Sequence, residues 1–408
     1  MDRKGMETQV TQPGGKVRSL QGVWLKAATV GGLWAAIEII LGSFLHNMRI
    51  PFAGSVLTFM GLSLLISFHR MWPEKGLILR AGIICALMKS ISPSSVILGP
   101  MSGIFFEALL LETGIRLLGA NRPGYFLGAA LGMLSTLIHK VISLLILYGM
   151  DIVTIYKNIY LFLAKQLQLP DANPWTLVWV VVAVYLIGGL FAATLGLSVG
   201  NRTARLQKES REGIGKLEDR DFFETSPDQR FSLWLLALHA ISIPLGLYLI
   251  NYTPIWIALA WYAIYLGFCV FYYRSSLRRL KKPVFWFQLF MITLLAAVFW
   301  SGFNMSEGVF KPEGLRVGLE MNLRAIFIVI AFSSLSVELR NPRIREYLFG
   351  KGFGNLYKAL GLAFNALPSM MRSMPKPRTF FKNPLMWFAR INLQAQNWLL
   401  FFEPEKKA

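Results

Sequence analysis

Ten apolar segments alternate with polar segments along the chain, and each is close to the length of about 20 residues that a membrane-spanning helix needs. They cover approximately residues 24–45, 52–69, 77–91, 96–118, 125–149, 175–199, 231–250, 254–273, 284–303 and 315–337. The pattern predicts an all-α polytopic membrane protein with about ten transmembrane helices. Because the first segment is long and has no small-residue cleavage site at its end, we expect it to remain as a membrane anchor.

The composition excludes a soluble enzyme. Hydrophobic residues make up 54% of the 408 residues and charged residues only 16%, and a soluble domain has no room to bury so many apolar side chains. The formal net charge of +20 comes from Lys and Arg residues that gather in alternate loops, which the positive-inside rule assigns to the cytoplasm. We therefore expect a multi-pass protein of the inner (plasma) membrane with both termini cytoplasmic. We expect its basic surface to contact the lipid bilayer, and we expect no nucleic-acid partner.

A strongly charged segment divides the chain. Residues 201–230 carry seven basic and seven acidic side chains and no apolar run, which is typical of a solvated cytoplasmic linker. It separates a six-span block, residues 1–200, from residues 231–408, which hold four spans and a basic tail. In the tail, apolar residues recur at three- or four-residue steps, which predicts cytoplasmic amphipathic helices. They would serve either as a surface anchor on anionic lipid or as a docking platform for a cytoplasmic protein.

Several ionisable residues fall inside the predicted spans, where each would cost about 2.5 to 3.5 kcal/mol at a helix centre. Such residues face the bundle interior, a water-filled cavity or one another, and an ion pair between Glu107 and Lys140 is plausible from their depth. An intramembrane enzyme is the alternative if Glu107, Glu112, His139 and Lys140 surround one cavity. Among all the ionisable residues inside the predicted spans, we single out Glu38, Glu107, His139 and Lys140.

A second group of polar residues lies at the outer ends of the first six spans. Six helices that close around them would suit capture of a small solute, an anionic one if Arg49 and Lys89 take part. The candidate substrate-binding residues are His46, Asn47, Arg49, Lys89, Ser92, Ser94, Ser95, Tyr148 and Asp151.

Catalytic and nucleotide-binding signatures are missing from the sequence. There is no HExxH, GxSxG or GxxxxGK[ST] motif, so any ATP-driven work needs a partner protein. Cys85 and Cys269 lie in separate apolar segments, and the four histidines are scattered, which argues against a metal site or a disulfide. We expect no enzymatic activity, no cofactor and no metal.

Small residues recur at four-residue spacing in the first span, at Ala28, Gly32 and Ala36, and such a stripe permits close helix packing. The segments 34–54 (WAAIEIILGSFLHNMRIPFAG) and 82–112 (GIICALMKSISPSSVILGPMSGIFFEALLLE) resemble the substrate-binding S component of energy-coupling factor (ECF) type ABC transporters. Segment 314–371 resembles the last span and coupling helices of the transmembrane T component. The whole chain thus looks like a fusion of the two components.

The resemblance implies a membrane subunit of an importer that captures a small solute, vitamin-like or metal-related, and is driven by separate ABC-type ATPase subunits. It implies that Ala28, Gly32 and Ala36 form the S–T interface. It also implies that arginines of the coupling helices enter grooves of the ATPases, and Arg372 and Arg390 are the nearest matches. An uncoupled secondary transporter or a scaffold is the remaining alternative, and it predicts no ATPase partner.

Overall fold

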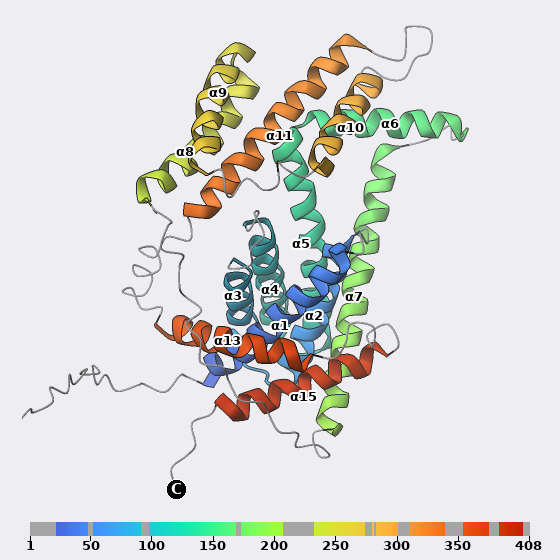
Figure 1. Ribbon diagram of the computed structural model, residues 1–408. Helices are drawn as coiled ribbons and strands as arrows, with labels where there is room; N and C mark the ends of the chain where they lie inside the picture. The colour runs from blue at the N-terminus through green and yellow to red at the C-terminus, as the bar shows by residue number, and fades with distance from the viewer. Residues whose placement is uncertain are drawn as a thin grey trace, which may run out of the picture.

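The computed structural model describes residues 22–47, 52–90, 98–168, 173–206, 232–273, 280, 283–300, 311–338, 354–374 and 383–402, and the described residues form helices and no strand (Figure 1). The helices are α1 Gly22–Asn47, α2 Ala53–Met71, α3 Leu77–Ser90, α4 Leu98–Leu118, α5 Arg122–Tyr148, α6 Asp151–Gln166, α7 Pro174–Leu206, α8 Leu233–Tyr252, α9 Ile255–Tyr272, α10 Pro283–Phe299, α11 Pro312–Glu338, α13 Gly354–Ser373 and α15 Pro384–Phe402.

The prediction of an all-α multi-pass membrane protein is confirmed. Among the described residues, six helices are long and apolar enough to cross a membrane, namely α1, α2, α5, α7, α8 and α9. The other predicted spans also form helices, but α3 has only 14 residues and α11 carries Arg316, Glu320 and Arg324. Large apolar side chains such as Trp179, Ile241 and Phe271 are exposed on α7, α8 and α9, as expected of surfaces that face lipid.

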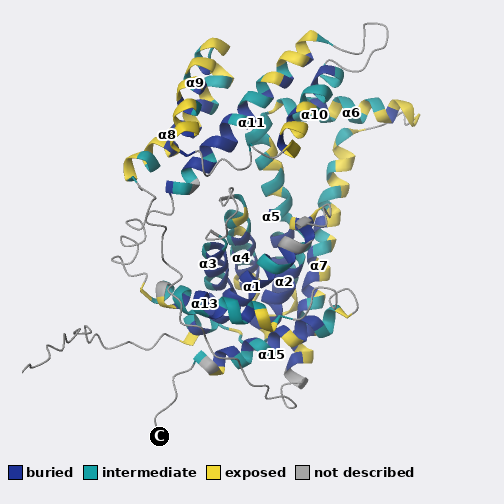
Figure 2. Ribbon diagram, viewed as in Figure 1, coloured by how far each residue is buried: buried dark blue, intermediate teal, exposed yellow. Residues whose placement is uncertain are grey.

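One apolar core joins both ends of the chain. It is built from α1 to α5 and α7, and the carboxy-terminal helices α13 and α15 belong to the same core. Helix α1 is its central element and is mostly buried (Figure 2). Helices α13 and α15 lie across the lower end of this bundle in the view of Figure 1.

A second group consists of α8 to α11, which pack in smaller apolar clusters above the bundle (Figure 1). Helix α5 reaches both groups, since Leu147 and Tyr148 at its end pack against α10 and α11. The start of α5 is fixed by Asn121, whose side chain accepts a hydrogen bond from the Gly124 N–H at 3.0 Å. Its end is fixed by Gly149, which has a positive φ of 74° and turns the chain into α6.

Two features differ from the sequence expectations. Helix α6 occupies a segment that the sequence left between spans, and Asp151 in its first turn and Lys165 in its last turn both complement the helix dipole. The apolar residues of α13 and α15, among them Phe364 and Phe388, are buried against the first six-helix block. Those faces are therefore not a lipid-facing surface anchor, because protein already covers them.

Candidate functional site

Helix α1 presents two neighbouring faces of small residues to two different helices. A Cβ at Gly31 would lie 2.8 Å from the carbonyl oxygen of Ala81 and 2.9 Å from the Ile84 side chain, so this face packs closely on α3. A Cβ at Gly32 would lie 3.0 Å from Met370 Sδ on α13. The structure thus places Gly32 at a helix crossing with the tail.

The two other residues of that predicted stripe, Ala28 and Ala36, are fully buried one turn on either side of Gly32. The four-residue spacing puts all three on one face of α1. Residues without bulky side chains allow the helix axes to approach, which is what a close crossing requires. We call the contact between this face and α13 the α1–α13 crossing.

Buried hydrogen bonds attach helix α15 to the bundle. Asn392 Oδ1 accepts a hydrogen bond from the Ser67 hydroxyl of α2 at 3.1 Å, and Asn392 Nδ2 donates to the Thr203 hydroxyl of α7 at 3.2 Å. All three side chains are buried. Because a buried amide needs hydrogen-bond partners, these two hydrogen bonds of Asn392 fix the rotation of α15 about its axis.

This rotation decides where the predicted coupling arginines lie. Ala389 and Ile391 are fully buried, whereas Arg390 between them is exposed. Arg372, in the last turn of α13, is exposed as well. The tail therefore turns its apolar faces toward the bundle and both arginines away from it.

Inside the bundle, Lys89 forms an ion pair with Glu38. The Lys89 Nζ lies 3.5 Å from Glu38 Oε2 and also donates to the Glu38 carbonyl oxygen at 3.2 Å. Both side chains are largely buried, with exposures of 17% and 9%. The positive charge of Lys89 is thus neutralised within the protein.

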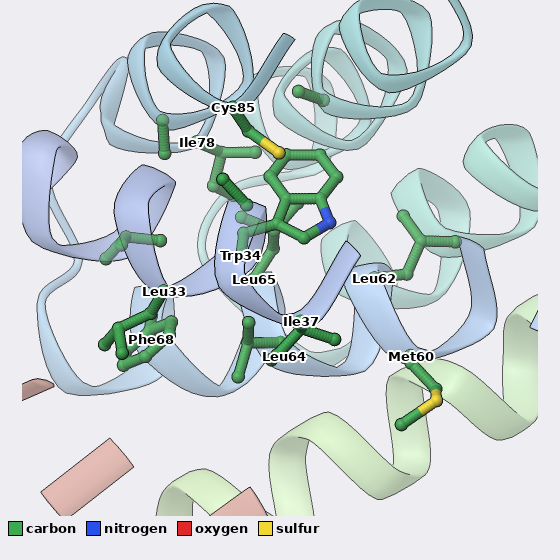
Figure 3. Packing of buried hydrophobic residues seen from close by; sticks show 14 of the residues in the cluster. Leu33, Trp34, Ile37, Met60, Leu62, Leu64, Leu65, Phe68, Ile78 and Cys85 are labelled. Carbon is green, nitrogen blue, oxygen red and sulfur yellow. The ribbon is translucent and has the colours of Figure 1, made fainter. Parts of the chain in front are cut away.

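A second carboxylate lies near this pair. Glu107 is 3% exposed, and its Oε1 has no hydrogen-bond partner. The indole nitrogen of Trp34 is also without a partner, and both atoms would lie within 3 Å of a Cβ placed on Gly61. Figure 3 shows the Trp34 ring among the buried apolar side chains of this core.

The predicted ion pair between Glu107 and Lys140 is wrong. Lys140 Nζ donates to the Ser55 hydroxyl at 2.6 Å and to the Tyr185 hydroxyl at 3.0 Å. Ser55 lies six residues before Gly61, which is about 9 Å along α2 at the helical rise. Lys140 therefore finds neutral partners at a different depth from Glu107.

Glu112 has a structural role that the sequence did not indicate. Its carboxylate accepts the backbone N–H of Gly76 at 2.6 Å and that of Leu79 at 3.4 Å, and it pairs with Arg116 at 3.0 Å. It thereby satisfies donors at the start of α3 that the helix leaves unpaired.

The four residues of the predicted enzyme set do not converge. His139 lies beside Gly99 at the start of α4, and Glu112 is 13 residues further along the same helix, or about 20 Å. Lys140 and Glu107 are separated as described above. In the described part of the chain, no three His, Cys, Asp or Glu side chains gather as metal ligands either.

Most of the predicted solute-binding residues lie outside the described residues or have side chains that are not described, namely His46, Asn47, Arg49, Ser92, Ser94 and Ser95. Of the rest, Lys89 pairs with Glu38 inside the bundle, and Tyr148 packs against α10 and α11. Asp151 lies 3.9 Å from Arg324 of α11. The structure does not join these three in one site.

Arg324 is a residue that the sequence reasoning missed. It is 5% exposed, its Nη2 donates to Asn251 Oδ1 at 2.7 Å, and its Nε and Nη1 have no hydrogen-bond partner. Burial raises the pKa of the neighbouring Asp151 carboxyl, while Arg324 opposes this rise and Glu320 adds to it. The rule that intramembrane charges carry function or pairing, applied to segment 315–337, would have singled out Arg324 but not its partners.

No protein-family model, no curated protein and no solved structure matches the chain.

Proposed function

We propose that this chain is the membrane subunit of an ECF-type ABC importer, with an S-like block that captures a small solute and a T-like block that couples its uptake to ATP hydrolysis. The observation that carries the proposal is the α1–α13 crossing, where the small face of α1 meets the tail at Gly32 and Met370. The tail is thereby in direct contact with α1, the helix that carries Glu38 of the buried Glu38–Lys89 ion pair.

The arrangement suits transmission of force. Arg372 and Arg390 are exposed, as a surface that docks on an ATPase requires, while the buried faces of α13 and α15 hold the first block. A movement imposed on the tail would then reach α1 directly. For transport, ATPase contact must favour one orientation of the first block by differential interaction, since solute binding favours the other.

The proposed topology has ten spans, the six long apolar helices together with α3, α4, α10 and α11, in the inner membrane with both termini cytoplasmic. The solute is small and vitamin-like or metal-related, and the partners are separate P-loop ATPase subunits. The chain performs no covalent chemistry and needs no cofactor of its own.

Co-purification tests the proposal. The tagged chain is expressed in its native host and extracted in mild detergent. We expect it to retain a P-loop ATPase, which mass spectrometry identifies. The double variant Arg372→Glu and Arg390→Glu is expected to lose it, because charge reversal opposes docking of an arginine in a groove.

The matched control reverses two exposed charges elsewhere, with Lys75→Glu and Arg202→Glu, and is expected to keep the ATPase. Absence of any P-loop ATPase from the wild-type preparation would refute coupling, as would equal recovery with the double variant. Native mass spectrometry of the same preparation identifies any retained solute.

A further inference from the structure

A basic cleft lies between the ends of α2, α5 and α7. Its volume is about 340 Å³. The described lining combines two arginines with amide and hydroxyl groups and three larger side chains, and no carboxylate is among these described residues. The residues are Arg70, Asn121, Arg122, Tyr125, Phe126, Thr194, Leu197, Ser198 and Asn201.

No carboxylate in the described part of the chain neutralises the charge of this cleft. Arg70 donates from Nε to Asn201 Oδ1 at 3.4 Å, a neutral partner, and neither Arg70 nor Arg122 forms an ion pair with any described carboxylate. Both arginines are exposed. Arg122 is also the first residue of α5, where the positive end of the helix dipole adds to the guanidinium charge.

The walls of the cleft are rigid. Asn121 bridges the Leu118 carbonyl oxygen and the Gly124 N–H, and the Tyr125 hydroxyl hydrogen-bonds to His69 Nδ1 at 3.0 Å. Close packing of Gly200 on Arg70 fixes α7 against α2, since a Cβ at Gly200 would lie 3.0 Å from the Arg70 Cβ. The ends of α2 and α5 that carry the two arginines are therefore fixed by packing and hydrogen bonds.

The surroundings are amphipathic in the manner of a phospholipid. Beyond Thr194, the next turns of α7 expose Ile187, Leu190 and Phe191. The predicted topology puts the arginine end at the cytoplasmic boundary and this apolar surface within the bilayer. The acyl chains of a lipid whose headgroup lies in the cleft would thus extend along this apolar surface.

We propose that this cleft binds the phosphate headgroup of an anionic phospholipid of the cytoplasmic leaflet. Guanidinium groups match phosphate oxygens with paired, charge-assisted hydrogen bonds, and basic pockets between transmembrane helices are a known form of lipid site. The inference requires the membrane orientation but not the importer function, so the two fail independently.

The test compares lipids in the whole protein. The wild-type chain in nanodiscs with equal amounts of phosphatidylglycerol and phosphatidylcholine is released into native mass spectrometry. We expect a retained phosphatidylglycerol and a clear preference over phosphatidylcholine. The double variant Arg70→Gln and Arg122→Gln is expected to bind phosphatidylglycerol about 30-fold more weakly, given the contribution of each basic residue near a membrane surface.

The matched control removes the same charge outside the cleft, with Lys75→Gln and Arg202→Gln, and is expected to keep the lipid. Gel filtration establishes that both variants keep the wild-type elution volume. Equal retention of the two lipids by the wild type, or unchanged retention by the cleft variant, overturns the proposal. Retention of inorganic phosphate in place of phosphatidylglycerol when the two are offered at equal concentration also overturns it, because the site would then prefer the free anion to the lipid.

Discussion

Met370 of α13 covers Gly32 of α1, so that a Cβ at position 32 would lie 3.0 Å from the Met370 sulfur and 3.5 Å from the Cβ of Ala363. The next residue, Gly31, is covered by α3 in the same way. Gly31 and Gly32 therefore allow α3 and α13 to pack closely on two sides of α1. The tail is held by the same helix that forms the centre of the bundle.

Replacement of Gly32 by leucine is expected to weaken the α1–α13 crossing. The added side chain has no space beneath Met370, and overpacking of this kind costs about 1 to 3 kcal/mol. The apparent Tm of the detergent-solubilised protein should fall, and α13 should become more accessible to protease.

Gly361 on α13 provides the matched control, because a Cβ there would meet nothing within 4 Å. Gly361→Leu should leave the apparent Tm unchanged or raise it slightly, since leucine favours a helix more than glycine does. Equal effects of the two substitutions would show that position 32 is not at a close crossing.

The sequence predicted the helices well because a membrane span is a local property. Each of the ten apolar segments forms a helix, and composition alone identifies such a run. Helix α6 was missed because its polar residues, such as Lys157 and Asn158, interrupt the apolar run that marks a span. Asn158 instead donates hydrogen bonds to the carbonyl oxygens of Phe299 and Trp300, a contact set by tertiary structure.

The partners of the polar residues were much less predictable. The depth expected from the sequence suggested Glu107 as the partner of Lys140, but in the structure the two lie at different depths along α2, and Lys140 meets Ser55 and Tyr185. The spacing of Ala28, Gly32 and Ala36 predicted a close helix contact. Which helix fills that face depends on how distant parts of the chain assemble.

Removal of the Lys89 side chain is expected to destabilise the bundle. Lys89→Ala leaves the Glu38 carboxylate buried without its partner, and the loss of one member of a buried pair costs about 3 to 5 kcal/mol. The amount of folded protein in the membrane and the apparent Tm should both fall.

A second variant separates pairing from packing. Lys89→Met together with Glu38→Gln removes both charges at similar volume, and it should recover most of the lost apparent Tm. If Lys89→Ala alone folds as well as the wild type, the charge of Lys89 is not tied up in this pair, and its role as a solute-binding cation regains support.

Asp151 gives a prediction about pH. Burial raises its pKa in the folded protein above the ordinary value of 3.8, so the folded state holds the proton more tightly than the unfolded state. Ionisation of Asp151 therefore opposes folding at neutral pH, and this penalty disappears as the pH falls through the raised pKa.

The variant Asp151→Asn mimics the protonated form at every pH. Its apparent Tm should exceed that of the wild type at pH 7, and the difference should shrink on acidification and vanish below the ordinary pKa. A constant difference across this range would mean that the carboxyl does not titrate in the folded protein as burial implies.

The number of spans can be tested at Arg316, near the start of α11. With ten spans this residue lies outside, whereas it lies in the cytoplasm if only the six long apolar helices cross the membrane. Its side chain is 81% exposed and its pairing with Glu320 within one helix contributes little, so Arg316→Cys should fold normally. The native cysteines Cys85 and Cys269 are fully buried and are replaced by serine or alanine to remove background labelling.

We expect a membrane-impermeant maleimide to label Arg316→Cys in intact cells. The reference variants are Lys157→Cys, which should also be labelled from outside, and Arg202→Cys, which should react only after the membrane is opened. Protection of Arg316→Cys in intact cells would place α11 with its start in the cytoplasm. Helices α10 and α11 would then not cross the membrane as proposed, and the tail would reach the cytoplasmic side of α1 without them.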